Sequence, residues 1–197
     1  MEIVLATRNQ KKLSELKALL ADMPVEVLSL RDFPEAPEVE ETGHTFTENA
    51  ELKARAAALA TGLIALADDS GLEVDALGGD PGVRSNRFAG PDAIDRDKCM
   101  LVLDLMKGVP DGKRSARFRA AVAVASPGGR VSVVEGTCEG IIAREPKGEG
   151  GFGYDPIFYL PDMGRTMAEI TPDEKNLISH RAKALHAAKT IVRRLIP

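Results

Sequence analysis

Short apolar runs that are typical of buried strands alternate along this chain with the patterns of amphipathic helices. Two of the apolar runs flank SPGG at 126–129, which is typical of a hairpin turn and makes that strand pair antiparallel. Strands mixed with helices, together with an antiparallel pair, predict an α/β domain with a mixed sheet. The predicted strands are residues 2–6, 25–30, 63–69, 116–125 and 130–140, and the predicted helices are 9–23, 46–62, 93–107 and 172–195.

Two of these helices open with a capping box, in which a threonine is followed three residues later by a glutamate. The pairs are Thr45 with Glu48 and Thr171 with Glu174, and Pro172 occupies the first helical position, which proline favours. The second box is expected to begin one helix that runs to the C-terminal end of the chain.

Size and composition argue against several classes of protein. The 197 residues, 44% of them apolar, suit a single soluble domain, 1–197, with two lobes. A net charge of −4 and an aromatic content of 4% argue against nucleic acid as a partner. No apolar run reaches the roughly 18 residues of a membrane span, and the N-terminus lacks the charge order of a signal peptide. Cys99 and Cys138 form no CxxC pair, which favours reduced thiols in a cytoplasmic protein.

Two carboxylates, Asp68 and Asp69, follow the apolar run LIALA and precede Ser-Gly. Neighbouring residues of a strand point to opposite faces, so at least one of the two is expected to project into a cleft or solvent. The carboxyl ends of strands are where α/β sheets usually bind ligands, and an acid there can hold Mg²⁺ or act as a general base. A polar turn that caps the strand is the alternative.

The loop at 34–43 is acidic and could bring further oxygen ligands to a cation. Glu38, Glu40 and Glu41 lie within it and could act together with Asp69, although a solvated run of charge is the alternative. The three histidines of the chain lack the spacing of a zinc site. Mg²⁺ is therefore the expected metal, held by one or two carboxylates with water and substrate phosphate completing its shell.

The segment TRNQKK at 7–12 joins a predicted strand to a predicted helix. Free N–H groups at a helix N-terminus attract anions, and Lys11 or Lys12 would add positive charge, so the segment could bind phosphate. It lacks the spacing of a Walker A loop. An ordinary strand-to-helix turn is the alternative.

The segment GEGGFGYDPIF at 148–158 contains G-x-G-x-x-G. Asp155-Pro156 follows where a dinucleotide-binding fingerprint requires a helix, so that interpretation is rejected. Glycines still permit the close approach of a planar ligand, on which Phe152 or Tyr154 could stack. A tight connection between strands is the alternative.

Arg181 interrupts an apolar stripe of the last predicted helix, to which Leu177, Ile178, Ala184 and Leu185 belong. An unpaired guanidinium is costly to bury, so Arg181 needs an anion. That anion is either an internal Asp or Glu or a bound phosphate, which Arg can contact with two donors.

Together, acids for a cation, basic groups for phosphates and a glycine–aromatic loop for a base fit hydrolysis of a nucleoside polyphosphate. Five blocks that span nearly the whole chain also resemble a known family, the inosine/xanthosine triphosphate pyrophosphatases, which remove deaminated purine nucleotides. The blocks are LATRNQKKLSEL, EETGHTFTENAELKA, ADDSGLEVDALGGDPGV, GGFGYDPIF and EKNLISHRAKAL, in the order of the family.

This resemblance implies an elongated α/β fold, in which a mixed sheet flanked by helices splits into two lobes around a central nucleotide-binding cleft. It implies hydrolysis of ITP, dITP and XTP to the monophosphate and pyrophosphate by a Mg²⁺-dependent homodimer. A donor such as Arg181 or His180 would favour a 6-oxo purine over adenine, because the 6-amino group of adenine cannot accept its hydrogen bond.

The resemblance also implies a role for individual residues. Asp69 would be the base that accepts a proton from water, helped by Asp68 and Glu41, and Glu40 with Asp69 would hold the metal. The remaining residues would bind the substrate: Thr7, Arg8, Asn9, Gln10, Lys11 and Lys12 its triphosphate, Ser70 an unspecified part of it, and Phe152, Gly153, Tyr154, Asp155, Lys175, His180 and Arg181 its purine.

One loop departs from the family pattern: PGVRSNRFAG has Arg84 and Asn86 where relatives often carry an aromatic and a small residue. This puts the contacts of that loop in doubt, including any dimer contacts. Two other functions stay open, namely a related pyrophosphatase for modified pyrimidine or methylated nucleotides, and a nucleotide sensor without catalysis.

Overall fold

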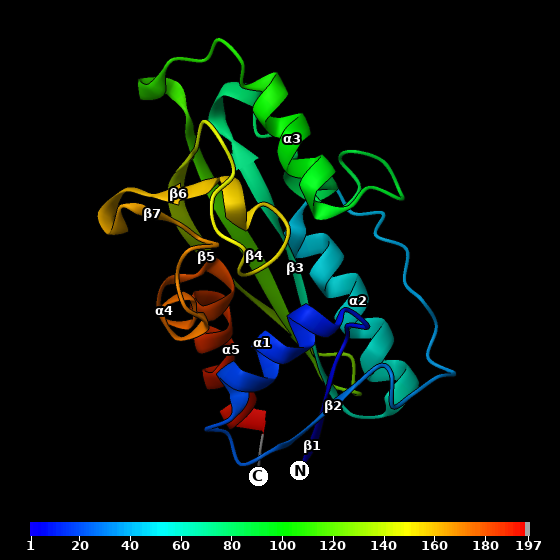
Figure 1. Cartoon of the computed structure of the whole chain (residues 1–197). Coiled ribbons are helices and arrows are strands. Elements are labelled where there is room, and N and C mark those ends of the chain that lie inside the picture. The colour runs from blue at the N-terminus through cyan, green and yellow to red at the C-terminus, as the bar shows by residue number, and fades with distance from the viewer. Residues whose placement is uncertain (196–197) are drawn as a thin grey trace. The chain divides into compact units, whose positions relative to one another are not determined.

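A seven-stranded mixed sheet organises the computed structural model, which describes residues 1–195 (Figure 1). The order of the strands in the sheet is β2-β1-β3-β4-β5-β6-β7. The strands are β1 (Glu2–Leu5), β2 (Glu26–Ser29), β3 (Ile64–Val74), β4 (Ser115–Ala125), β5 (Val131–Ile142), β6 (Phe158–Leu160) and β7 (Arg165–Thr166). The helices are α1 (Gln10–Leu20), α2 (Phe46–Thr61), α3 (Asp95–Leu105), α4 (Pro172–Ile178) and α5 (His180–Leu195).

Both strand directions occur, which confirms the predicted mixed sheet. β1 runs parallel to β2 and to β3, whereas β6 runs antiparallel to β5 and to β7. The SPGG turn joins the adjacent strands β4 and β5, and it is closed by a hydrogen bond from the Ser126 N–H to the Arg130 carbonyl at 2.9 Å. Among residues 1–195, the longest helices are too short or too polar to cross a membrane.

The chain contacts divide the protein into two compact units. Unit 1 comprises residues 1–69 and 120–136 and the chain from His180 onward, and its core gathers aliphatic side chains of β1, α1 and α5. Unit 2 comprises residues 70–119 and 137–179, and its core includes Met106, Ile157 and Phe158. Each unit therefore has a core of its own.

Both predicted capping boxes are present. In α2, the Thr45 hydroxyl accepts the Glu48 N–H at 3.1 Å and the Glu48 carboxylate accepts the Thr45 N–H at 3.2 Å. The same exchange between Thr171 and Glu174 opens α4, with Pro172 in the first position. The local sequence thus sets where these two helices begin.

The single helix predicted over residues 172–195 is wrong, because the helix is interrupted at Ser179, between α4 and α5. Ser179 has the extended backbone angles φ −65° and ψ 154°, and its N–H closes α4 on the Lys175 carbonyl at 2.9 Å. Leu177 is consequently 80% exposed and does not belong to the apolar stripe that was predicted for it.

The predicted strand end at Asp69 is also wrong, since β3 continues to Val74. Gly71 does not stop the strand; it admits a close neighbour, because a Cβ at this position would overlap the Ser85 hydroxyl. That hydroxyl accepts the Leu72 N–H at 2.9 Å. The glycine therefore lets the chain around Ser85 pack directly on β3.

Candidate functional site

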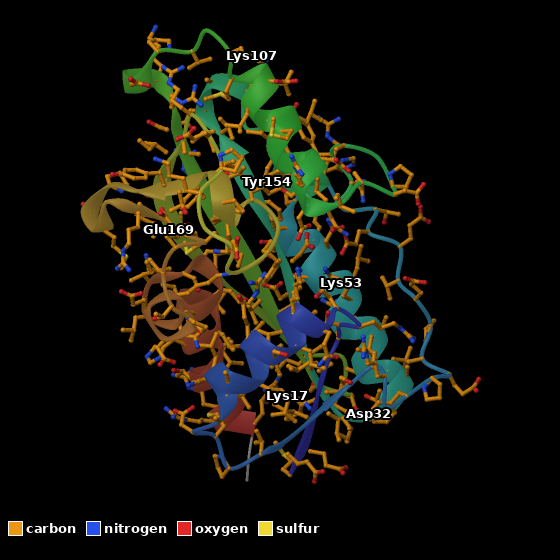
Figure 2. All side chains as sticks on the ribbon, viewed as in Figure 1. Lys17, Asp32, Lys53, Lys107, Tyr154 and Glu169 are labelled. Atoms are coloured by element: carbon orange, nitrogen blue, oxygen red, sulfur yellow. The ribbon has the colours of Figure 1, made fainter. Side chains whose placement is uncertain are left out.

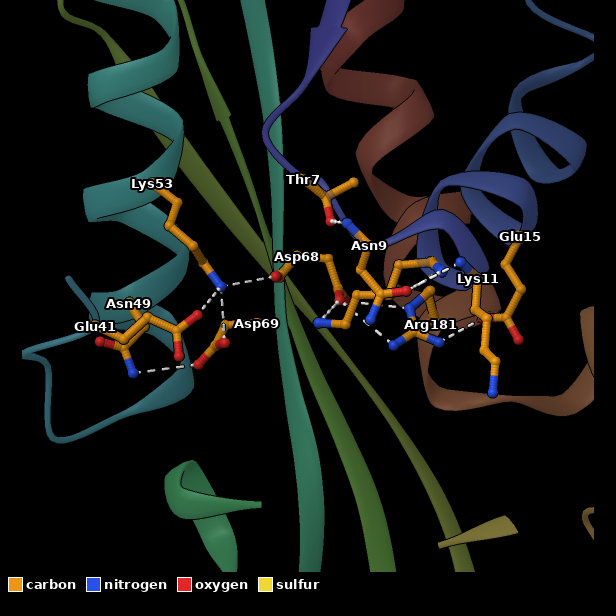
Figure 3. Close-up of polar contacts among 11 residues, drawn as sticks. Thr7, Asn9, Lys11, Glu15, Glu41, Asn49, Lys53, Asp68, Asp69 and Arg181 are labelled. Carbon is orange, nitrogen blue, oxygen red and sulfur yellow. Dashed lines mark hydrogen bonds and ion pairs between the residues drawn. The ribbon is translucent and has the colours of Figure 1, made fainter. Parts of the chain in front are cut away.

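The carboxylates of Asp68 and Asp69 lie on opposite sides of β3, as Figure 3 shows. This follows from the alternation of side chains along a strand. Both residues are nevertheless buried, with exposed fractions of 6% and 5%. The expectation that one of them projects into solvent is wrong, because both carboxylates are buried beside cationic side chains of unit 1.

Asp69 lies in a group of polar side chains with α2. The ammonium of Lys53 lies 2.8 Å from Asp69 Oδ1, 2.7 Å from Glu41 Oε1 and 3.0 Å from the Asp68 carbonyl (Figure 3). Asn49, one helical turn before Lys53, donates from Nδ2 to Asp69 Oδ2 at 3.3 Å. Its own Oδ1 accepts the Gly43 N–H at 2.8 Å, which ties the acidic loop to the same group.

The surroundings of Asp69 raise the pKa of its side chain. Burial raises the pKa of Asp69 and the Glu41 charge raises it further, while Lys53 lowers it without cancelling the rise. Burial lowers the pKa of Lys53, but Asp69 and Glu41 outweigh burial and leave it raised. Asp69 therefore has a raised pKa beside the Lys53 ammonium, and a raised pKa makes a carboxylate a better proton acceptor.

Asp68 lies in a different group, with α1 and α5. Its Oδ2 is 2.8 Å from the Lys12 ammonium and 3.4 Å from Arg181 Nη2, and Arg181 Nη1 donates to Glu15 Oε2 at 2.5 Å. Burial alone raises the pKa of Asp68, but the Arg181 and Lys12 charges hold it well below its usual range. Adjacent carboxylates with pKa values pushed apart are suited to different tasks.

Arg181 thus pairs with internal acids, which is the structural alternative that the sequence left open. It is 2% exposed, and the stripe around it continues along α5 through Ala184, Leu185 and Val192. His180 is buried as well. The desolvation cost of burying this guanidinium is offset by its ion pairs with the carboxylates of Glu15 and Asp68, which come from distant segments of the chain.

The segment 7–12 caps the start of α1. Asn9 Oδ1 accepts the N–H groups of Lys11 and Lys12 at 3.0 and 3.2 Å, and Thr7 Oγ1 accepts the Asn9 N–H at 3.2 Å. The expectation of free N–H groups is therefore wrong for these two lysines. Arg8, Asn9, Gln10 and Lys11 are exposed, so it is their side chains that solvent or a ligand can reach.

Unit 2 brings together three of the predicted purine-binding residues. The Lys175 ammonium lies 2.7 Å from Asp155 Oδ2 and 4.8 Å from the centre of the Phe152 ring. Asp155 Oδ2 also accepts the Phe152 N–H at 2.9 Å. Tyr154, which is labelled in Figure 2, is only 4% exposed and donates from its hydroxyl to the Ser85 carbonyl at 2.8 Å. Phe152 is half-buried, so its ring is the more exposed of the two. Ser70 is half-buried in β3.

The predicted metal ligands are only partly brought together. Glu40 is exposed, and its neighbour Glu41 is the acid that shares Lys53 with Asp69. Within residues 1–195, no three side chains of His, Cys, Asp or Glu gather into a metal site. The donors fit a hard cation that takes one or two carboxylates from the protein and its other ligands from water and phosphate.

Sequence reasoning missed Asn49, Lys53 and Glu15. Asn49 lies on the face of α2 that buries Phe46, Ala50 and Ala57, so it interrupts an apolar stripe in the way that drew attention to Arg181. Lys53 follows Asn49 by one turn. The buried face of α2 therefore contained the signal for this part of the site.

Comparisons with known proteins agree on one family. Residues 3–191 match the model of the Ham1 family. The dITP/XTP pyrophosphatase of Geobacillus kaustophilus is 59% identical over 93% of this chain and 90% of its own length, and that of Bacillus subtilis is 52% identical over 93% of each.

Solved structures give the same result. The HAM1 protein of Coxiella burnetii superposes with a TM-score of 0.90 at 47% identity, covering 98% of this chain and 99% of the other. A nucleoside-triphosphatase (dITP/XTP pyrophosphatase) of Mycobacterium abscessus superposes with a TM-score of 0.79 at 49% identity, covering 95% and 98%. With a family match over nearly its whole length, this chain belongs to the Ham1 family.

Proposed function

We propose that this chain is a nucleoside triphosphate pyrophosphatase, which hydrolyses the deaminated purine nucleotides ITP, dITP and XTP to the monophosphate and pyrophosphate. Relatives that bear the name dITP/XTP pyrophosphatase support the reaction and the substrate class. The observation that carries the proposal is the separation of Asp68 and Asp69. One carboxylate is fixed in ion pairs with basic residues, while the other has the raised pKa of a proton acceptor.

Asp69 is the residue we assign to the attacking water. Its carboxylate would accept the proton as the water attacks the α-phosphorus, and general base catalysis of this kind contributes about a hundredfold to ten-thousandfold. Lys53 and Asn49 hold the two oxygens of Asp69, so the carboxylate has a fixed direction. Loss of the bond between the α- and β-phosphates releases pyrophosphate.

Mg²⁺ is the cofactor we infer, with Asp69 and Glu40 as its protein ligands. A bound Mg²⁺ supplies neutralisation of the charge on the phosphates. The Lys53 ammonium lies 2.8 Å from Asp69 and 2.7 Å from Glu41, so this lysine stabilises both acids by ion pairing.

The triphosphate is assigned to the segment from Thr7 to Lys12. The support is the exposure of Arg8 and Lys11 next to Lys12, whose ammonium is held by Asp68. The purine is assigned to Phe152, Gly153, Tyr154, Asp155, Lys175, His180 and Arg181, and Ser70 is assigned to the substrate without a specified part. Arg181 already donates to Glu15 and Asp68, so its part in purine binding rests on the family resemblance.

A homodimer, a cytoplasmic location and the absence of nucleic-acid and membrane partners are inferences from composition and resemblance. The same holds for a single functional domain over residues 1–197. These inferences do not affect the reaction proposed for Asp69.

A substrate panel with identified products tests the proposed function. The purified protein is incubated with ITP, XTP, dITP, ATP and GTP, with Mg²⁺ and with EDTA, and products are separated by ion-exchange chromatography. We expect IMP and pyrophosphate from ITP, little turnover of ATP, and no turnover in EDTA. Release of IDP and orthophosphate would contradict the position of cleavage. A preference for modified pyrimidine or methylated nucleotides would favour the related pyrophosphatase. Binding of nucleotide without turnover would favour a sensor.

A further inference from the structure

The first two turns of α3 bind both backbone polar groups of Gly153. Asp95, the first residue of α3, accepts the Gly153 N–H on Oδ2 at 2.8 Å. Cys99, one turn later on the same helix, donates from Sγ to the Gly153 carbonyl at 3.3 Å. Asp95 also pairs through Oδ1 with the buried Lys98 at 3.0 Å. All of these residues belong to unit 2.

A shift of the Gly153 backbone would move the two aromatic residues next to it in the sequence. Its φ of +64° lies in the left-handed region that side chains other than glycine disfavour, although nothing lies within 4 Å of where a Cβ would be. Phe152 before it is tied to Asp155, and Tyr154 after it is tied to Ser85. The contacts with α3 therefore hold the backbone of Gly153 in the middle of the turn. The aromatic residues on either side of it are held by other residues of unit 2.

We propose that Asp95, assisted by Cys99, is a positioning residue for purine recognition in this enzyme. The inference rests on the proposed function, which assigns residues 152–155 to the base. Asp95 acts through the Gly153 peptide: it sets where the Phe152 ring and the Asp155–Lys175 pair stand relative to the backbone of the turn.

The consequence concerns discrimination between bases more than the rate of hydrolysis. A site with fixed donors rejects a base that cannot satisfy them, and the rejection weakens when the donors can move. Without the Asp95 carboxylate, the turn can shift, so 6-oxo purines bind less well and adenine is excluded less strictly. Asp95 also lies in the first turn of a helix, where an acid stabilises the helix end, and this purely structural role needs a separate control.

Three variants separate the two roles. Asp95→Ala removes the acceptor for the Gly153 N–H and the partner of Lys98. Asp95→Asn keeps an acceptor oxygen but no charge, and Lys98→Met removes the ion pair while leaving the bond to Gly153. The ratio of kcat/KM for ITP to kcat/KM for ATP is measured for each variant with Mg²⁺, along with the thermal unfolding midpoint.

We expect the ITP-to-ATP ratio to fall about tenfold in Asp95→Ala, mainly through a higher KM for ITP. The ratio should stay within about threefold of wild type in Asp95→Asn and Lys98→Met. Cys99→Ala removes only a weak donor and should lower the ratio about twofold. If Asp95→Ala does not fold, Asp95→Ser replaces it, because serine suits a helix start but is too short to replace the carboxylate.

A spectroscopic readout tests the positioning itself. The chain has two tyrosines, so 3-fluorotyrosine labelling gives one ¹⁹F resonance for Tyr154 and one for Tyr159, and Tyr159→Phe assigns them. The Tyr154 resonance should shift in Asp95→Ala but not in Lys98→Met, while that of Tyr159 stays in place. A helix-stabilising role alone would lower the unfolding midpoint and leave the Tyr154 resonance unchanged.

The outcomes distinguish this inference from the proposed function. Wild-type enzyme that shows no preference for ITP overturns the proposed function and the inference with it. Wild-type enzyme that prefers ITP, together with an Asp95→Ala variant that keeps the full ratio, overturns the inference alone. An equal fall of the ratio in Lys98→Met would also overturn it, since the Gly153 contact is intact there.

Discussion

Asp68 and Asp69 are consecutive residues of β3, yet their carboxylates belong to separate groups of ion pairs. Asp68 lies 2.8 Å from the Lys12 ammonium, and Asp69 lies 2.8 Å from that of Lys53. The two lysines come from different helices, and the pKa values of the two acids move in opposite directions. One strand thus presents an acid with a lowered pKa on one side and an acid with a raised pKa on the other.

Asp69→Asn should lower kcat for ITP about a thousandfold, because the amide cannot accept the proton of the attacking water. Nucleotide binding should survive, since the contacts of the triphosphate segment are unchanged. Rates are measured by pyrophosphate release, and binding by calorimetry with ITP. Turnover close to that of wild type would remove Asp69 from the mechanism.

Asp68→Asn should instead weaken the fold, by about 3 kcal/mol at pH 7, because it breaks a buried ion pair. The folded-state pKa of Asp68 lies below its ordinary value of 3.8, so its contribution to stability is present above that pH and is lost as the pH falls further. Urea unfolding of wild type and variant at pH 7, 5 and 3 should show a difference that narrows only at the lowest pH. Asp104→Asn, which breaks an exposed pair with Lys107, is the control and should have little effect.

Gly136→Ala should destabilise the protein by about 2–3 kcal/mol or prevent folding. A Cβ on Gly136 of β5 would overlap the His180 carbonyl and the Ala184 N–H, which are backbone groups of α5 that cannot rotate away. Gly128→Ala in the SPGG turn is the matched control, since its Cβ would have no neighbour nearer than 3.9 Å. Thermal unfolding compares them, and equal midpoints would show that α5 packs less closely on β5 than described.

Cys99 should resist alkylation in the folded protein. Burial, with Asp95 and Asp155 nearby, raises its pKa from 9.0 to about 12, so it stays a neutral thiol at pH 8. The folded state therefore holds this proton more tightly than the unfolded chain, and the associated stability is lost as the pH rises from 9.0 toward 12. Iodoacetamide labelling followed by mass spectrometry should modify Cys99 only after urea is added, and rapid labelling of the native protein would contradict its burial.

The elements that the sequence predicted well are those with local signals. The capping boxes at Thr45 and Thr171 and the SPGG turn depend on residues a few positions apart, and all three form as expected. Apolar runs and helical patterns likewise predicted an α/β fold with a mixed sheet. Such features need no knowledge of distant parts of the chain.

The features that were missed depend on partners far away in the sequence. Two acids followed by Ser-Gly suggested the end of a strand. The strand continues because Lys12, Lys53 and Arg181 neutralise these acids, and all three basic residues are remote along the chain. The break at Ser179 has no local signal, since serine neither forces nor forbids a helix there. Asn49 was detectable as a polar residue on an apolar helix face, but its bond to Asp69 required the fold.

Ser179 is the whole connection between α4 and α5, and it is also where the chain passes from unit 2 to unit 1. A one-residue connection cannot change length by itself, so inserting or deleting a residue there must unwind part of one of the two helices. Residues 30–45, which connect β2 to α2, can change length without such unwinding. Insertions and deletions should therefore be tolerated in the part of the long connection that precedes Glu38. They should be excluded from the short connection, which keeps Lys175 and Arg181 at a constant separation along the chain.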